Sequence, residues 1–197
     1  MEGTNPVNKK LAAALSGGAV LVLALSGCSS SSGNNDKLNS WAKQVCDAVQ
    51  PQIKKIATAN VAIQKEASDD SAPEDVQKAD TKGFKDISDA YKVMATAIEK
   101  AGPPDVDDGK KKQKDAVKEL NDLSASYADL GKQSDALDTK DQAKFADGLS
   151  GVAEQLGKLS QSGTDALKKL EEGDVGKAMA TQASCKAASA APSATKG

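Results

Sequence analysis

The chain has 197 residues and a formal net charge of −2, with 28 acidic residues against 26 basic ones. All of the basic residues are lysines and histidine is absent, so the usual side chains for bidentate phosphate recognition, general base catalysis and transition-metal binding are missing. This composition argues against a nucleic-acid surface, a metal centre and an enzyme, and no cofactor is expected. Aromatic residues make up 3% of the chain, which suits close-packed helices better than a large aromatic-lined pocket.

The N-terminal segment has the pattern of an export signal. Lys9 and Lys10 precede an apolar run from Leu11 to Leu25, and small residues follow, which is typical of a secretory signal rather than a membrane-spanning helix. The motif Leu25-Ser26-Gly27-Cys28 resembles a bacterial lipobox. This resemblance implies cleavage before Cys28, its lipidation with diacylglyceryl and palmitate groups, and a mature protein tethered to the extracytoplasmic face of the cell membrane. The alternative is an ordinary signal peptide, which would leave the cysteine as a free thiol.

These features divide the chain into four parts. We expect residues 1–27 to form the signal peptide, residues 28–35 a flexible Ser/Gly tether, residues 36–186 a helical bundle, and residues 187–197 a disordered tail. Apolar residues recur every three or four positions through the third part, which predicts amphipathic helices.

The first helix is expected from about Asp36 to Lys65, with an apolar stripe that includes Trp41. Trp41 is interpreted as an amphipathic plug at the tether end of the bundle, with a binding anchor as the weaker alternative. Pro51 lies inside this helix and lacks a backbone N–H. It therefore predicts either a kink near Ala48 or a later start of the regular helix.

The second helix is expected from a cap at Ser71 to about Lys100. Glu74 would close a capping box with Ser71, and a proline occupies the first turn. A glycine and two prolines at residues 102–104 would end the helix. Its apolar stripe consists of Val76, Phe84, Ile87, Tyr91, Met94 and Ile98.

The third and fourth helices are expected to be similarly long. The third would start near Asp105 and reach about Leu137. The fourth would follow a second capping box at Thr139 and continue to about Leu170, with a heptad seam typical of near-parallel helix packing. Several glycines weaken this fourth helix, so a break around residues 160–164 is the main alternative to a continuous helix.

A short fifth helix is expected from about Val175 to Lys186. Four long helices joined by short turns predict an all-α fold: an up-down-up-down four-helix bundle plus a short C-terminal helix, pinned by a disulfide. With Cys28 assigned to lipid, Cys46 and Cys185 are an even pair in an oxidising setting, where a disulfide is the default and two free thiols the alternative. Counting the helical rise places both cysteines at about the same height in the bundle, as a bridge requires.

The acidic run before the third helix is a weak candidate for cation binding. The segment Asp105-Val106-Asp107-Asp108-Gly109 resembles a calcium loop, but its glycine comes one position early. Ala116 also stands where a bidentate Glu is needed, so a helix start is expected instead. Signatures of a nucleophile or a phosphate-binding loop are absent from the sequence.

The one basic run is a candidate contact for anionic lipid headgroups or wall polymers. A solvated face neutralised by the preceding aspartates is the favoured alternative. The lack of interleaved aromatic residues argues against nucleic acid as a partner. The run consists of Lys110, Lys111, Lys112 and Lys114.

The signal, the lipobox, the Ser/Gly tether, the Trp41-to-Cys46 opening and the late second cysteine together resemble the uncharacterised small secreted lipoproteins of Gram-positive, high-GC bacteria. The resemblance implies a helical extracytoplasmic domain and supplies no activity and no site residues. We therefore expect a membrane-tethered interaction or scaffold module of the cell envelope, with another envelope protein or a wall polymer as its partner. The alternative is a small-ligand-binding or sensory bundle, with a cavity where the glycines of the fourth helix face Phe84 or Tyr91.

Overall fold

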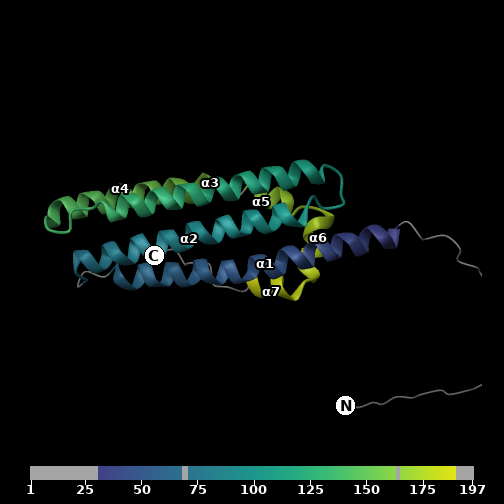
Figure 1. The fold of residues 1–197 in the computed structure, drawn as a ribbon, viewed down its shortest axis with the longest axis horizontal. Helices are drawn as coiled ribbons and strands as arrows, with labels where there is room; N and C mark the ends of the chain where they lie inside the picture. The colour runs from purple at the N-terminus through teal and green to yellow at the C-terminus, as the bar shows by residue number, and fades with distance from the viewer. Residues whose placement is uncertain (1–30, 68–70, 163–164, 190–197) are drawn as a thin grey trace, which may run out of the picture.

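The computed structural model describes residues 31–67, 71–162 and 165–189, and these residues form seven α-helices and no strand (Figure 1). The long helices run in alternating directions, so the predicted all-α, up-down-up-down bundle is confirmed. The long helices are α1 (Ser31–Glu66), α2 (Pro73–Ala101), α3 (Gly109–Asp135) and α4 (Gln142–Ser162). The short helices are α5 (Asp165–Leu170), α6 (Asp174–Thr181) and α7 (Ala183–Ser189).

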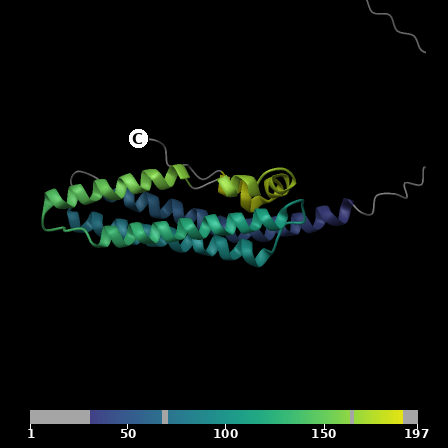
Figure 2. The same ribbon diagram turned by 90° about the horizontal axis from the view of Figure 1, so that it is seen from above.

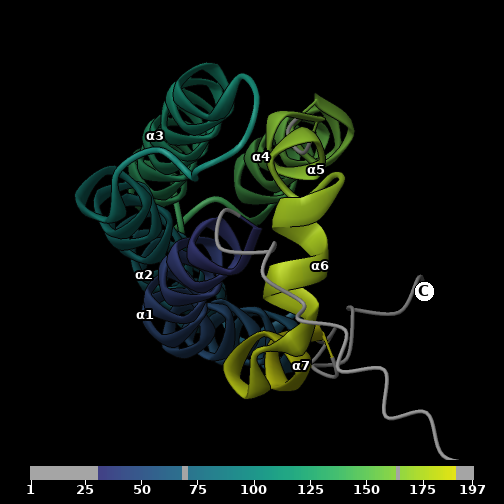
Figure 3. The same cartoon turned by 90° about the vertical axis from the view of Figure 1, so that its right-hand side faces the viewer.

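The four long helices differ in how extensively they pack against one another. α2 packs most extensively against α3 and then against α1, whereas α4 contacts mainly α3. Viewed along the bundle, α6 crosses one side from α5 to α7, and α7 lies beside α1 (Figure 3). The side between α4 and α1 is therefore bridged near the N-terminal half of α1 by the short C-terminal helices.

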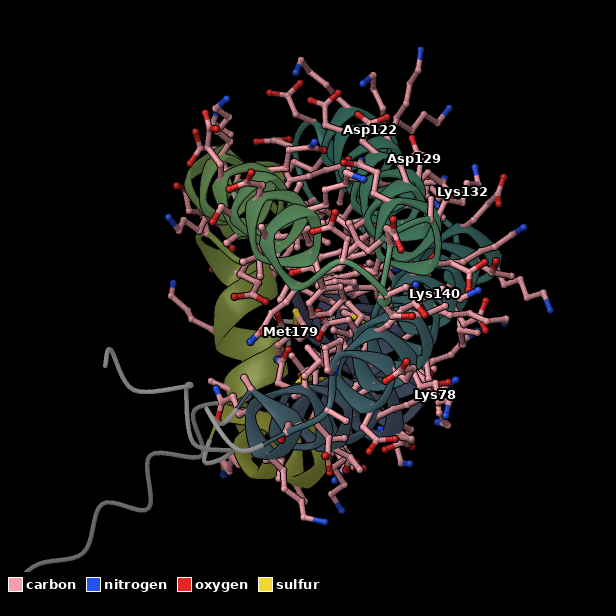
Figure 4. All side chains as sticks on the ribbon, turned by 90° about the vertical axis from the view of Figure 1, so that its left-hand side faces the viewer. Lys78, Asp122, Asp129, Lys132, Lys140 and Met179 are labelled. Carbon is pink, nitrogen blue, oxygen red and sulfur yellow. A yellow bond between two sulfur atoms is a disulfide. The ribbon has the colours of Figure 1, made fainter. Side chains whose placement is uncertain are left out.

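The apolar side chains form two core clusters along the bundle. The cluster near the start of α1 contains Trp41, Val45, Ile98, Leu120, Leu170 and Val175. The cluster toward the far end is centred on Ala59, Phe84, Ile87, Leu130 and Val152. Charged side chains such as Lys78, Asp122 and Lys132 lie on the periphery, while Met179 of α6 packs against the first cluster (Figure 4). This division follows the amphipathic pattern of each helix.

The predicted disulfide between Cys46 and Cys185 is confirmed. It joins α1 to α7 with a Cα–Cα separation of 5.1 Å. Beside it, the hydroxyl of Ser184 donates a hydrogen bond to the carboxylate of Asp47. These two contacts fix the C-terminal helices to the first helix.

The N-terminal boundary of the bundle differs from the expectation. α1 begins at Ser31 rather than near Asp36, so residues 31–35 belong to a helix and not to the tether. Elongating an existing helix costs far less than nucleating one, and the packed turns around Trp41 supply the nucleus. The helix also continues through the exposed Pro51, so the predicted later start of the regular helix is wrong.

The helices α2 and α3 start at other residues than the sequence patterns predict. Ala72, not Ser71, is the N-cap of α2, with φ −69° and ψ 143° and no side-chain cap bond. Proline at the first helical position forces the residue before it into this extended conformation. α3 starts at Gly109 rather than near Asp105, because Asp108 has a left-handed φ of 58° that cannot continue a helix.

The fourth helix also starts and ends differently. Asp141 caps α4 by accepting a hydrogen bond from the backbone N–H of Lys144 at 3.2 Å, so the predicted cap at Thr139 is wrong. α4 and α5 follow one another along the same side of the bundle as separate helices (Figure 2). The alternative of a break within residues 160–164 therefore describes the chain better than one helix to Leu170.

The expected single C-terminal helix is likewise divided. Gln182 has an extended conformation with ψ 130° and separates α6 from α7. α7 continues to Ser189, so the first three residues of the expected tail, 187–189, are helical. The expected signal peptide, Cys28, and residues 190–197 lie outside the described residues. In the described part of the chain, each helix is too short or too polar to cross a membrane.

Candidate functional site

An apolar groove lies between α4 and the adjoining ends of α1 and α2. It has a volume of about 440 Å³ and lies at the end of the bundle that the short C-terminal helices do not cover. The apolar side chains that line it include Ile63 of α1, Val76 and Phe84 of α2, and Phe145, Leu149, Val152 and Leu156 of α4. The groove thus has an apolar wall on each side.

The groove exists because α4 presents a wide apolar face that α1 and α2 cover only in part. Phe145 and Val152 are buried, whereas Leu149 and Leu156 on the same face are half-buried. On the opposite wall, Gly83 lets α1 approach α2 closely: a Cβ there would lie 2.6 Å from the side chain of Ile63. The close α1–α2 contact and the looser α4 leave the space between them.

Asp80 is the one titratable side chain among the described residues that line the groove. Its exposed fraction is 7%, and no other described residue donates a hydrogen bond to its carboxylate or pairs with it. Burial raises the pKa of Asp80 to about 6, because the apolar surroundings disfavour the charged form. At neutral pH the group is still mostly ionised, so the groove holds an uncompensated negative charge.

The floor of the groove is held from behind by aromatic packing between α2 and α3. Phe84 contacts Tyr127 with ring centroids 6.2 Å apart, and Tyr127 stacks on Tyr91 at 5.6 Å. Burial raises the pKa of Tyr91 to about 12. Next to these rings, the hydroxyl of Ser88 donates a hydrogen bond of 2.7 Å to the backbone carbonyl of Ser124. The α2 wall is therefore rigidly supported.

The cavity predicted from the sequence lies beside Phe84 as expected, but the glycines of α4 do not form it. A Cβ at Gly148 would overlap the side chain of Leu137, so this glycine serves the contact of α4 with the loop that follows α3 instead. Nothing lies within 4 Å of a Cβ at Gly151, and Tyr91 does not line the groove. The leucines and phenylalanine of the heptad seam, not the glycines, make the α4 wall.

The sequence analysis did not identify Asp80. Its position in the sequence indicates burial, because Asp80 lies four residues after Val76 and four before Phe84, on the apolar stripe of the second helix. An acidic residue within an apolar stripe is a candidate for a buried charge.

The basic run lies at the start of α3, away from the groove. Lys110, Lys111 and Lys114 are exposed and Lys112 is half-buried. The ammonium group of Lys111 lies 2.6 Å from the carboxylate of Asp115, and this hydrogen bond raises the pKa of Lys111. For Lys111 the counter-charge therefore comes mainly from the following turn rather than from the preceding aspartates.

Trp41 lies at the tether end, beside a wide hollow of about 980 Å³. Its exposed fraction is 6%, and its indole N–H donates a hydrogen bond of 2.8 Å to the carbonyl of Gly102. Both observations agree with a structural plug and leave little of the ring to act as a binding anchor. The described residues also contain no cluster of three or more acidic, cysteine or histidine side chains that could hold a metal ion.

Comparisons of the chain with protein-family models, with curated proteins and with solved structures found no match. The groove and the N-terminal motif are therefore the two features from which a function can be proposed.

Proposed function

We propose that the protein is a membrane-tethered extracytoplasmic helical bundle that binds a small apolar ligand in the groove between α2 and α4. The groove itself carries this proposal. Its volume of about 440 Å³ lies within the range of roughly 300–1,000 Å³ that is usual for ligand sites, and its mostly apolar lining with a few polar side chains, of which only Asp80 is titratable among the described residues, has the usual composition. The lipobox motif ending in Cys28 supports the membrane tether and the extracytoplasmic location.

Binding of a ligand would complete a core that the chain leaves open. Leu149 and Leu156 remain half-buried because none of the described helices covers them on the groove side. A ligand that covers them would remove apolar surface from water, which is the main favourable contribution to binding in such sites. The proposal is one of binding and not of catalysis, because a single carboxyl group offers no acid–base pair or nucleophile–base pair.

Fluorescence titration with N-phenyl-1-naphthylamine, an uncharged apolar probe, tests this function. The Cys28→Ala chain would be exported from the expressing cell, so that it carries no lipid and forms its disulfide. We expect saturable, one-to-one enhancement of the probe's fluorescence. Ala146→Trp, which places a large ring in the groove, should abolish this enhancement, whereas Ala143→Trp on the exposed face of the same helix should leave it unchanged. Equal binding to the two variants, or no binding to the native chain, would contradict the proposal.

A second candidate function is the interaction or scaffold role in the cell envelope. The observation that favours it is Val93 of α2, which is 47% exposed and lies in a shallow hollow between α1 and α2 with Ala48 and Ala97. Exposed apolar surface of this kind suits an envelope protein or a wall polymer as partner. A photo-crosslinking residue in place of Val93 should capture one dominant partner on intact cells, and one in place of Val61 should not.

A further inference from the structure

We infer that the groove is selective for a monocationic amphiphile, with an ammonium group placed against Asp80 and an apolar body against α4. This inference rests on the proposed function, since it specifies the ligand class of the same site. It concerns the head group of the ligand, which the apolar walls alone do not determine.

Asp80 lacks the ion-pair partner that neighbouring aspartates on α2 have. Asp86 and Asp89 each have a lysine four residues earlier, and both pairs form ion contacts. The residue four positions before Asp80 is Val76, and the residue four positions after it is Phe84. The nearby Lys78 and Lys82 pair with Asp75 and Asp86, and no described residue neutralises the carboxylate of Asp80.

A carboxylate that is 7% exposed and unpaired is costly in an apolar environment, and a cation brought to it gains more than it would in water. Burial raises the pKa of Asp80 to about 6, so the group remains mostly charged at neutral pH and available to a cation. An anionic ligand would meet a like charge, and a neutral ligand would leave the charge of the carboxylate uncompensated.

The lining of the groove favours an organic cation over a metal ion. A calcium or magnesium ion requires several oxygen ligands, and Asp80 is the one acidic side chain among the described residues of the groove. The side chains one turn before and one turn after it, Val76 and Phe84, are apolar and line the same groove. An ammonium group that carries an alkyl or aryl body satisfies both the charge and the surrounding surface.

Displacement of N-phenyl-1-naphthylamine from the full chain by three compounds of equal chain length tests the inference. They are octylamine, octan-1-ol and octanoate, whose head groups at neutral pH are a cation, a neutral hydroxyl and an anion. We expect octylamine to displace the probe at a concentration about tenfold lower than octan-1-ol, and octanoate to be the weakest, because one charged contact in a buried site is worth at least that factor.

Two variants assign this preference to the carboxylate. Asp80→Asn should reduce the difference between octylamine and octan-1-ol to less than about twofold, while probe binding persists. Asp89→Asn, on the same helix but outside the groove, should keep the native preference. Equal displacement by the amine and the alcohol in the native chain would overturn the inference, as would a preference that survives in Asp80→Asn. Either result would leave the proposed function intact, whereas failure of the native chain to bind the probe would overturn both.

Discussion

Replacing Asp80 with asparagine tests the energetic cost of placing a carboxyl group in the groove. Burial raises the pKa of this group from its ordinary value of 3.8 to about 6 in the folded chain. One pKa unit corresponds to about 1.4 kcal/mol. Ionised Asp80 therefore lowers the free energy of unfolding by about 3 kcal/mol relative to its protonated form.

The sign of the pH dependence follows from which state holds the proton more tightly. The folded chain does so, because its pKa is the higher one. Protonated Asp80 therefore stabilises the folded state fully below the ordinary pKa of 3.8, and this contribution is lost as the pH rises through about 6. The pH dependence that Asp89 contributes has the opposite sign. A hydrogen bond from Lys85 lowers the pKa of its carboxyl group, so its stabilising contribution is present above the ordinary pKa of 3.8 and is lost as the pH falls below it.

Urea unfolding of the native chain and of Asp80→Asn, measured from about pH 4 to about pH 8, isolates this contribution, since the effects of the other carboxyl groups cancel in the difference. We expect the variant to gain about 2–3 kcal/mol of unfolding free energy relative to the native chain across this range. Asp89→Asn should differ from the native chain by a nearly constant amount over this range, because its lowered pKa places its titration below the ordinary value of 3.8. A difference between Asp80→Asn and the native chain that stays constant with pH would refute a buried, unpaired carboxyl group.

Three further predictions concern the bundle and its anchor. Reducing the disulfide between α1 and α7 should lower the free energy of unfolding by about 5 kcal/mol, because it frees a loop whose ends are 139 residues apart in sequence. Equal urea midpoints with and without reductant would contradict this prediction. Gly109→Ala should destabilise the chain by about 1–3 kcal/mol, because its Cβ would overlap the carbonyl oxygen of Pro104. Gly151→Ala should stabilise the chain by up to about 1 kcal/mol in the same urea unfolding assay, because nothing lies within 4 Å of the added Cβ. Cys28→Ala should release the protein from membranes, and a variant that still sediments with them would argue against the lipid anchor.

The sequence predicts most of the bundle because its apolar periodicity is strong. The stripe through Phe84 and Ile87 and the seam from Phe145 to Val152 identify the buried faces of α2 and α4. The disulfide followed from cysteine parity and helical rise. These features are local or countable, so one chain is sufficient to predict them.

The details that the sequence did not predict depend on contacts between distant segments. Asp108 ends the loop before α3 with a left-handed conformation. An aspartate tolerates this conformation, but its presence in a sequence does not predict it. The groove depends on how loosely α4 packs against α1 and α2, and no residue of α4 alone shows this. Asp80 was a visible exception on an apolar stripe, but its burial became apparent only when Phe145 and Val152 were placed opposite α2.

The groove has the character of a site that is kept at the expense of stability. An unpaired carboxylate at position 80 disfavours the folded chain at neutral pH, and asparagine would remove that cost without changing the shape. Such a residue is typical of a position retained for binding rather than for folding.

Methyl NMR of the full chain titrated with octylamine tests the central claim most directly, because it locates the ligand within the bundle. The account predicts shifts in the methyl groups of Ile63, Val76 and Val152, which line the groove, and unchanged signals from Val45 and Val175 in the core at the tether end. Shifts that centre on Val45 and Val175, or no shifts at all, would contradict it.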